Sequence, residues 1–108
     1  MTINSKQKGS RSERQVAKIL REHGFTDARR TAQYCGNTGD AADVIGIDGY
    51  HLEIKHQERT QIWSWIEQAQ HDAKDGEVPT VIFRQNRKPW MVCISLEDFL
   101  DLLNKQAD

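Results

Sequence analysis

The stretch "AADVIGIDGYHLEIKH", which runs from Ala41 to His56, decides how this chain folds. Two apolar runs, 43–47 and 50–56, stand on either side of Asp48-Gly49. Runs of this length that are rich in β-branched and aromatic residues indicate strands, and Asp-Gly between two such runs is typical of a hairpin turn. The stretch therefore predicts two antiparallel strands.

The second run carries charges that an ordinary strand avoids. Glu53 and Lys55 lie inside it, although both residue types are depleted in strands. Because residues i and i+2 of a strand share a face, Glu53 and Lys55 point to the same side as His51, which we expect at the surface. Leu52 and Ile54 point to the other side, into a core. The charged face is either a solvated ion pair or a functional site.

The connection between the strands decides whether Asp43 joins this charged face. A strict two-residue turn would place Asp43 opposite Ile54, on the face away from Glu53. An odd-numbered connection, or one bulge, changes the parity and places Asp43 opposite Lys55, so that all three charges share a face. Gly46 makes such a bulge easy. A functional site therefore predicts a bulge, and a purely structural hairpin predicts a plain two-residue turn.

The rest of the chain supplies helices and strands around the hairpin. Helical or alternating spacing of apolar residues predicts a helix over 10–23, a weak strand over 25–33, a helix from Thr60 to about residue 75, strands over 79–84 and 90–94, and a helix from Ser95 through Leu103. We expect residues 1–9 to form a flexible basic arm and residues 10–105 to form a single domain. The order α-β-β-β-α-β-β-α predicts the α/β class, a mixed sheet flanked by helices.

Composition limits the class of protein. The chain has 108 residues, of which 37% are hydrophobic and 29% charged, so one modest core is expected and disorder is not. No apolar run is long enough to cross a bilayer, and we expect no membrane partner. The two cysteines, Cys35 and Cys93, lie far apart, which suits a reducing compartment, and we expect the protein in the cytoplasm.

Charge is unevenly distributed although the net charge is only -1. Residues 1–30 carry eight basic and three acidic side chains, whereas residues 91–108 carry one basic and four acidic side chains. A basic N-terminal third can contact phosphates, or it can be a solvated helix face.

The spacing Asp-x9-Glu-x-Lys, formed by Asp43, Glu53 and Lys55, resembles the signature of the PD-(D/E)XK nucleases. The segment "KGSRSERQVAKILREHGF" resembles the first helix of the archaeal-type Holliday junction resolvases, a branch of that superfamily whose helix carries a glutamate, here Glu13. "WIEQAQHDA" and the strands after it are similar to the second half of the same branch, and the virus-type replication-repair nucleases share the architecture. The resemblance covers residues 8–103. Ala42 replaces the proline that often precedes the aspartate.

The resemblance implies a restriction-endonuclease-like core and a metal-dependent DNA endonuclease. Asp43, Glu53, the backbone carbonyl of Ile54 and Glu13 would hold Mg²⁺, for which Mn²⁺ would substitute, because hard cations prefer oxygen ligands. Lys55 would hold the attacking water and steady the phosphate. The alternative for Glu13 is a capping box with Ser10.

The resemblance also implies partners. The expected substrate is branched DNA, cut in the course of recombination or repair by a homodimer that nicks two strands symmetrically. So small a chain is expected to recognise the DNA backbone and shape. The expected DNA-binding residues are Lys8, Arg11, Arg14, Arg29, Arg30 and Thr38. Gln68 is a candidate helper of the site, and Gln70 is an alternative to it.

Two other functions remain open at this point. One is a replication or repair nuclease that acts on flaps, nicks or linear duplex, as in the virus-type group. The other is a non-catalytic DNA-binding module on the same fold. A phage or prophage origin would suit so compact a nuclease.

Overall fold

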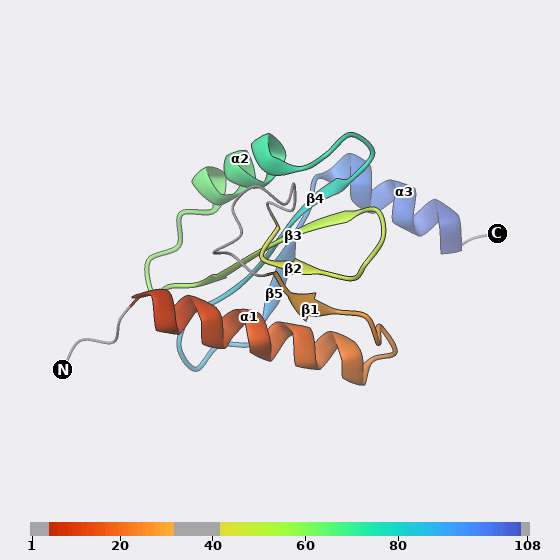
Figure 1. Cartoon of the computed structure of the whole chain (residues 1–108). Coiled ribbons are helices and arrows are strands. Elements are labelled where there is room, and N and C mark those ends of the chain that lie inside the picture. Colours follow the sequence, from red (N-terminus) through yellow and green to blue (C-terminus); the bar gives the residue numbers. More distant parts are fainter. Residues whose placement is uncertain (1–4, 32–41, 107–108) are drawn as a thin grey trace.

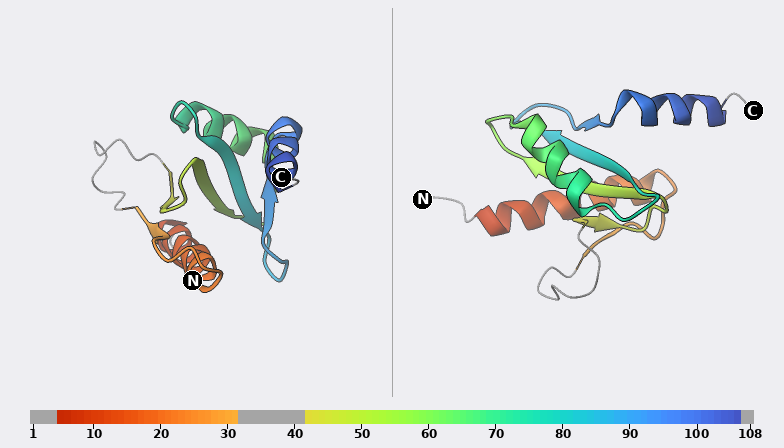
Figure 2. Two further views of the ribbon diagram at one scale, coloured as in Figure 1. Left: turned by 90° about the vertical axis from the view of Figure 1, so that its right-hand side faces the viewer. Right: turned by 90° about the horizontal axis from the view of Figure 1, so that it is seen from above.

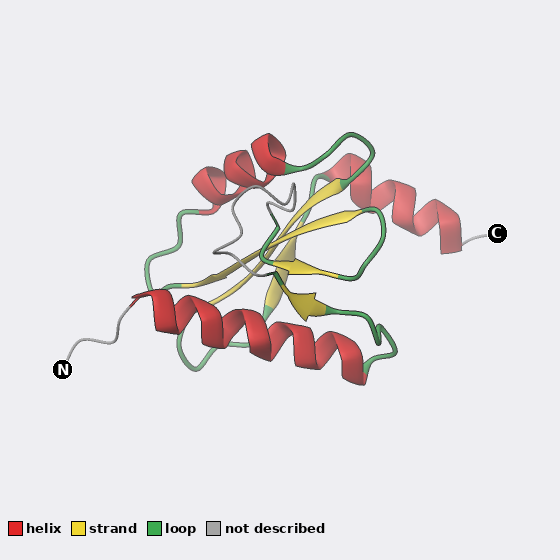
Figure 3. Ribbon diagram, viewed as in Figure 1, coloured by secondary structure: helices red, strands yellow, loops and turns green. Residues whose placement is uncertain are grey.

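A computed structural model describes residues 5–31 and 42–106, which form three helices and a five-stranded sheet (Figures 1 and 3). The elements in chain order are α1 (Ser5–Glu22), β1 (Arg29–Arg30), β2 (Val44–Ile45), β3 (Tyr50–His56), α2 (Ile62–Asp72), β4 (Val78–Arg84), β5 (Met91–Cys93) and α3 (Leu96–Gln106). The element order is the one that the sequence predicts, and β3 spans the predicted residues.

The sheet is mixed and keeps the strands in chain order, β1-β2-β3-β4-β5. β3 and β4 pair in parallel, and the crossover between them contains α2. The other neighbours pair antiparallel. The α/β class with a mixed sheet flanked by helices is therefore confirmed, and the architecture is consistent with a restriction-endonuclease-like core.

Helices cover both faces of the sheet, with α1 on one side and α2 on the other (Figure 2). Alternation along the strands produces two cores, because successive side chains point to opposite faces. The larger core lies under α1 and consists of Val16, Ala17, Val44, Leu52, Ile54 and Ile82. The smaller core lies under α2 and consists of Trp65, Ala69 and Val81.

The β2–β3 connection contains the predicted bulge. The amide of Tyr50 donates to the carbonyl of Ile47 over the Asp48-Gly49 turn, yet Val44 pairs with Leu52. This register leaves one extra residue on the β2 side, where Gly46 has a φ of 105°. A side chain at Gly46 would also overlap the backbone of Asp27, so both the conformation and the close packing require glycine.

The bulge gives Asp43 the parity that a functional site requires. Continuing the Val44–Leu52 register by one residue brings Asp43 beside Glu53, on the same face. The predicted change of parity is confirmed. The predicted pairing of Asp43 with Lys55 is wrong by two residues along β3. The extra residue lies in the β2 side of the hairpin, before the turn, so Asp43 lies opposite a residue nearer to the turn than predicted.

Several predicted boundaries need correction. α1 begins at Ser5, so residues 5–9 continue the helix where the sequence analysis expected an arm. The predicted cap at Thr60 is wrong, since the N-cap residue of α2 is Gln61 and its side chain makes no capping hydrogen bond. The predicted cap at Ser95 is confirmed, because its hydroxyl accepts from the amide of Asp98 at 3.0 Å.

Two further observations complete the fold. His56 lies on the α1 side of the sheet, where it hydrogen-bonds Ser12 at 3.1 Å and Asn86 at 2.8 Å and so connects the end of β3 to α1 and to the turn after β4. None of the helices in the described parts of the chain is both long and apolar enough to cross a bilayer.

Candidate active site

Asp43 lies just before β2 and is held by the backbone on both sides. On the β1 side, the amide of Thr31 donates to the Asp43 carbonyl at 3.2 Å, and the Thr31 hydroxyl donates to the Ala42 carbonyl at 2.9 Å. On the β3 side, the amide of Ile54 donates to Oδ2 of Asp43 at 2.8 Å. The carboxylate is therefore fixed against β3 next to Glu53.

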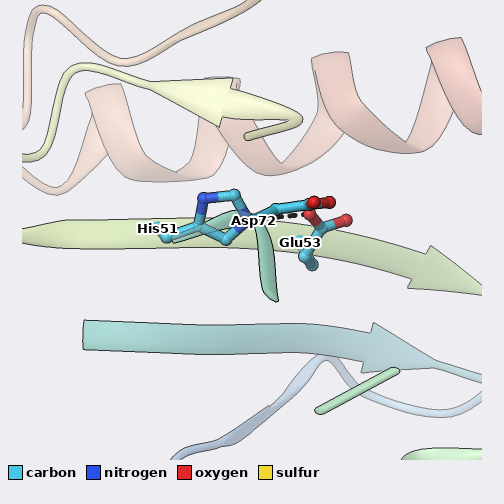
Figure 4. A group of neighbouring side chains, drawn as sticks. All are labelled: His51, Glu53 and Asp72. Carbon is cyan, nitrogen blue, oxygen red and sulfur yellow. Dashed lines mark hydrogen bonds and ion pairs between the residues drawn. The ribbon is translucent and has the colours of Figure 1, made fainter. Parts of the chain in front are cut away.

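Glu53 is a buried charge in the middle of β3. Its side chain is 2% exposed, and its Oε1 accepts a hydrogen bond of 2.7 Å from Nε2 of His51, which is equally buried (Figure 4). A carboxylate is rarely buried unless it is paired or binds a metal. The expectation that His51 lies at the surface is wrong: α2 covers this face of the sheet, so the residue two positions before Glu53 is enclosed with it.

The surroundings of Asp43 disfavour the charged form of its carboxyl group. The pKa of Asp43 is raised to about 7, first by burial and then by the negative charge of Glu53, with a further contribution from Glu13 and from a hydrogen bond with Glu53. The Ile54 amide opposes this rise. Two carboxyl groups this close share a proton unless a cation balances them. This donor set fits a hard divalent cation, whose binding would remove the repulsion.

Glu13 reaches the site from α1. It is buried, and its Oε1 accepts a hydrogen bond of 2.9 Å from Nε of Arg30 in β1. Because α1 begins at Ser5, Ser10 lies inside the helix, and the capping-box interpretation of Ser10 and Glu13 is wrong. Glu13 lies at the edge of the site, and its negative charge contributes to the raised pKa of Asp43.

Lys55 is held by α2. Its Nζ donates to Oε1 of Gln68 at 3.0 Å. Gln70 lines a different, largely apolar groove between α2 and the start of α3. Of the two glutamines that the sequence analysis left open, Gln68 is the one beside the site.

A hollow of about 450 Å³ opens beside these groups. Its lining comes from the first half of α1, from Asp43 and from the end of β3, and consists of Gly9, Glu13, Asp43, Ile54, Lys55, His56, Gln57 and Glu58. The lining joins carboxylates and an ammonium group in one recess.

Asp72 is a neighbour of the site that the sequence did not reveal. Ligand atoms of His51, Glu53 and Asp72 lie within 4.8 Å of one another (Figure 4). Asp72 ends α2, 19 positions after Glu53, and no motif connects it to the hairpin. A signal that could have indicated Asp72 is the place of its helix in the chain. A helix that connects β3 to β4 and packs on the face of His51 and Glu53 brings its last residues near them.

The pKa of His51 reflects these acidic neighbours. Burial by itself lowers the pKa, but the hydrogen bond and the charge of Glu53 outweigh it, so the pKa is raised above its ordinary value. Glu77 and Asp72 act in the same direction. A protonated His51 supplies positive charge next to Glu53.

The predicted DNA-binding residues differ in their surroundings. Arg11 and Arg14 are exposed on α1, and Arg29 is exposed on β1. Arg30 is half-buried and engaged by Glu13. Thr38 and the side chain of Lys8 lie outside the described residues.

Comparison with protein families places this chain in a known class. Residues 4–108 match the model of the family described as "Phage putative PDDEXK endonuclease". The chain belongs to this family. Its membership in the PD-(D/E)XK superfamily, which the spacing of Asp43, Glu53 and Lys55 predicts, is confirmed, and the family points to a phage origin.

Membership supports nuclease activity in general. PD-(D/E)XK endonucleases are nucleases that act on DNA and generally use divalent metals, and the carboxylates found here suit that chemistry. Searches among curated proteins and among solved structures gave no match.

Proposed function

We propose that this PD-(D/E)XK endonuclease hydrolyses phosphodiester bonds in branched DNA, with Mg²⁺ as its cofactor and Mn²⁺ as a substitute. The observation that carries the proposal is the pair of Asp43 and Glu53, two carboxyl groups from adjacent chain segments that are fixed in place and repel each other. Two neighbouring buried carboxylates are unfavourable unless one of them is protonated or a cation lies beside them.

The ligands of the metal would be Asp43, Glu53 and the carbonyl oxygen of Ile54, with Glu13 completing the shell or orienting a bound water. When bound, Mg²⁺ would polarise the phosphate and supply a more acidic water. The Ile54 amide donates to Oδ2 of Asp43 and so holds this carboxyl group against β3, where it can serve as a ligand beside Glu53.

Lys55 would act on the attacking water and on the phosphate. Gln68 accepts a hydrogen bond from one N–H of the ammonium group. The remaining N–H bonds of Lys55 would then donate to the water and to a phosphate oxygen. Gln68 would thereby fix the position of Lys55, which lines the recess with Glu13 and Asp43. This role for Gln68 is positional, since it acts through Lys55.

The substrate is proposed from charge and size. Exposed Arg11 and Arg14 on α1, with Arg29 on β1, would contact phosphates near the recess. Lys8 and Thr38 would extend this contact. Arg30 has Glu13 as its partner, so we assign it first to holding Glu13 and second to the phosphate. Contacts of this kind position the backbone and make binding weaken steeply with salt.

The resemblance to Holliday junction resolvases leads us to propose a four-way junction as the substrate and a homodimer as the active form. A two-fold dimer presents two equivalent sites to two strands of a junction. Work on DNA would place the protein in the cytoplasm.

One experiment tests these proposals together. Purified protein is incubated with a labelled four-way junction and with linear duplex of the same sequence, in Mg²⁺ and in EDTA, beside Glu53→Ala. Paired nicks in the junction that need both Mg²⁺ and Glu53 are expected.

The other outcomes separate the alternatives. Equal cutting of both substrates would retain the nuclease and remove the junction preference, in favour of an enzyme for flaps, nicks or linear duplex. Junction binding without cutting in either Mg²⁺ or Mn²⁺ would indicate a DNA-binding module.

A further inference from the structure

α3 is an amphipathic helix whose apolar side is left uncovered. Leu96, Phe99, Leu100 and Leu103 recur at the spacing of one helical face, yet no side chain of α3 is buried among the described residues. Leu96 is 71% exposed, and the other three are each nearly half exposed. Trp63 on α2 is 74% exposed. We call these five side chains the α3 surface.

This arrangement is unstable for a helix on its own. Isolated helices shorter than about 12–15 residues are marginal in water, and most helices in proteins are held by packing of an apolar face. α3 has 11 residues and extends away from the sheet, so that its last turn lies at one extremity of the molecule (Figures 1 and 2). The Ser95 cap defines where α3 begins, but it does not cover the apolar face.

The α3 surface borders a groove. A hollow of about 670 Å³ lies between α2 and the start of α3, and Trp63 and Leu96 stand in its lining with Ile62, Ile66, Val81 and Cys93. The same surface therefore carries a protruding apolar stripe and an apolar recess. A surface with both shapes can be complementary to its own copy across a two-fold axis.

The charges of α3 bear on the class of partner. Glu97 and Asp98 lie in its first turn, and Lys105 lies in its last turn. Lys105 follows Leu96 by nine positions, about two and a half helical turns, so it lies on the opposite side of α3 from the apolar stripe. A nucleic acid is disfavoured on this surface, because the polar side chains beside the stripe are mainly acidic.

The exposed area is at the lower limit of what a dimer needs. Five large side chains, from nearly half to three-quarters exposed, offer roughly 100 Å² each, or about 500 Å² per copy. Burying them on both copies removes about 1,000 Å² in total, the smallest area expected of a specific interface.

We propose that the α3 surface binds a second copy of this chain, with α3 packed antiparallel against α3 of the partner across a two-fold axis. Leu103 of the partner subunit then lies at the mouth of the groove beside Trp63 and Leu96. The proposal names the interface of the dimer suggested above, but it rests on the exposed surface and not on nuclease activity.

The first test is the mass of the full chain in solution. Sedimentation or light scattering at about 1–100 µM, without DNA, is expected to show a dimer for the wild type and a monomer for Leu100→Glu. Phe25→Glu is the matched control, because Phe25 is 48% exposed but lies in the turn after α1, and it should remain dimeric. Circular dichroism verifies that each variant is folded.

A charge exchange within the stripe tests the antiparallel arrangement. Leu103→Glu is expected to weaken dimerisation about tenfold, and adding Leu96→Lys is expected to restore part of it, because antiparallel packing brings position 103 of each copy beside position 96 of the other. A wild type that stays monomeric at about 100 µM, or a Leu100→Glu variant as dimeric as the wild type, would overturn the proposal. A double variant weaker than Leu103→Glu alone would overturn the antiparallel packing.

Discussion

The two faces of β3 are buried to a similar degree but contribute to the protein in opposite ways. Under α1, Leu52 and Ile54 pack with Val16, Ala17 and Val44 in an apolar core. Under α2, His51 and Glu53 form a hydrogen-bonded pair that is as fully enclosed as Leu52. One face stabilises the fold, and the other keeps charge where burial disfavours it.

The difference teaches how one strand can serve two purposes. Burying an apolar side chain is favourable by about 1.5–3 kcal/mol. Burying a carboxylate is unfavourable, and only the hydrogen bonds and opposite charges around it reduce the penalty. Variants of the charged face should therefore affect activity more than stability, and variants of the apolar face should do the reverse.

The largest effect is expected from Glu53→Gln. The variant keeps the size of the side chain but removes the charge that would bind the metal, so cleavage should fall by about a thousandfold or more. The melting temperature in EDTA should not fall, because an unfavourable buried charge is gone. Rates and thermal unfolding are measured beside Glu67→Gln, an exposed residue of α2 whose substitution should change neither. Loss of stability equal to that of a core variant would contradict the contrast between the faces.

The reverse effect is expected from Leu52→Ala. Leu52 is 3% exposed in the core under α1, and removing three carbons there should lower the free energy of unfolding by about 2–5 kcal/mol. Cleavage per folded molecule at low temperature should stay within a few-fold of wild type. Urea titration gives the first quantity, and a tenfold loss of activity in fully folded protein would show that the two faces are not separable.

A third test uses pH. The pKa of Asp43 is about 7 in the folded chain and 3.8 for the ordinary group, so the folded state binds more protons between these values. The free energy of unfolding in EDTA should therefore fall as pH rises from about 4 to about 7, by up to a few kcal/mol.

Asp43→Asn sharpens this test. Its side-chain oxygen can still accept a hydrogen bond from the Ile54 amide, but the side chain no longer ionises. The free energy of unfolding of the variant should therefore change little between about pH 4 and about pH 7. Without metal at pH 8, the variant should be more stable than the wild type. Mg²⁺ should stabilise the wild type and not the variant. Melting curves at several pH values measure both effects, and a wild-type melting temperature that rises over this range would rule out the assignment.

A smaller effect is expected from His51→Leu. The change leaves Glu53 without its hydrogen-bond donor, and loss of a group that orients a metal ligand typically weakens metal affinity by about 10–100-fold. Activity at saturating Mg²⁺ should be largely retained, and His51→Gln, which keeps a donor, should recover part of the affinity. Titration of the metal against both cleavage and melting temperature distinguishes this effect from simple destabilisation.

The smallest effect is expected from Gln68→Ala. Losing the acceptor for Lys55 should lower kcat by a few-fold, with little change in KM for DNA. Gln70→Ala on the same helix is the control and should leave the rate unchanged, since Gln70 lines the groove next to α3. Equal effects of the two variants would remove Gln68 from the site.

The sequence by itself determined the local features of this protein. The alternation in β3, the Asp48-Gly49 turn and the Ser95 cap depend on neighbours a few residues away, and each lies where it was expected. Asp43, Glu53 and Lys55 were also singled out, because their spacing on a hairpin resembles the signature of the PD-(D/E)XK nucleases.

Only the tertiary structure decided which neighbours complete the site. His51 is buried because α2 covers its face, Asp72 arrives with the end of that helix, and Arg30 holds Glu13 because β1 pairs beside β2 next to α1. The register that places Asp43 beside Glu53 likewise depends on Gly46 fitting against Asp27, a contact across the fold. Propensity and periodicity describe residues near in sequence, whereas burial and charge pairing depend on segments that meet only after folding.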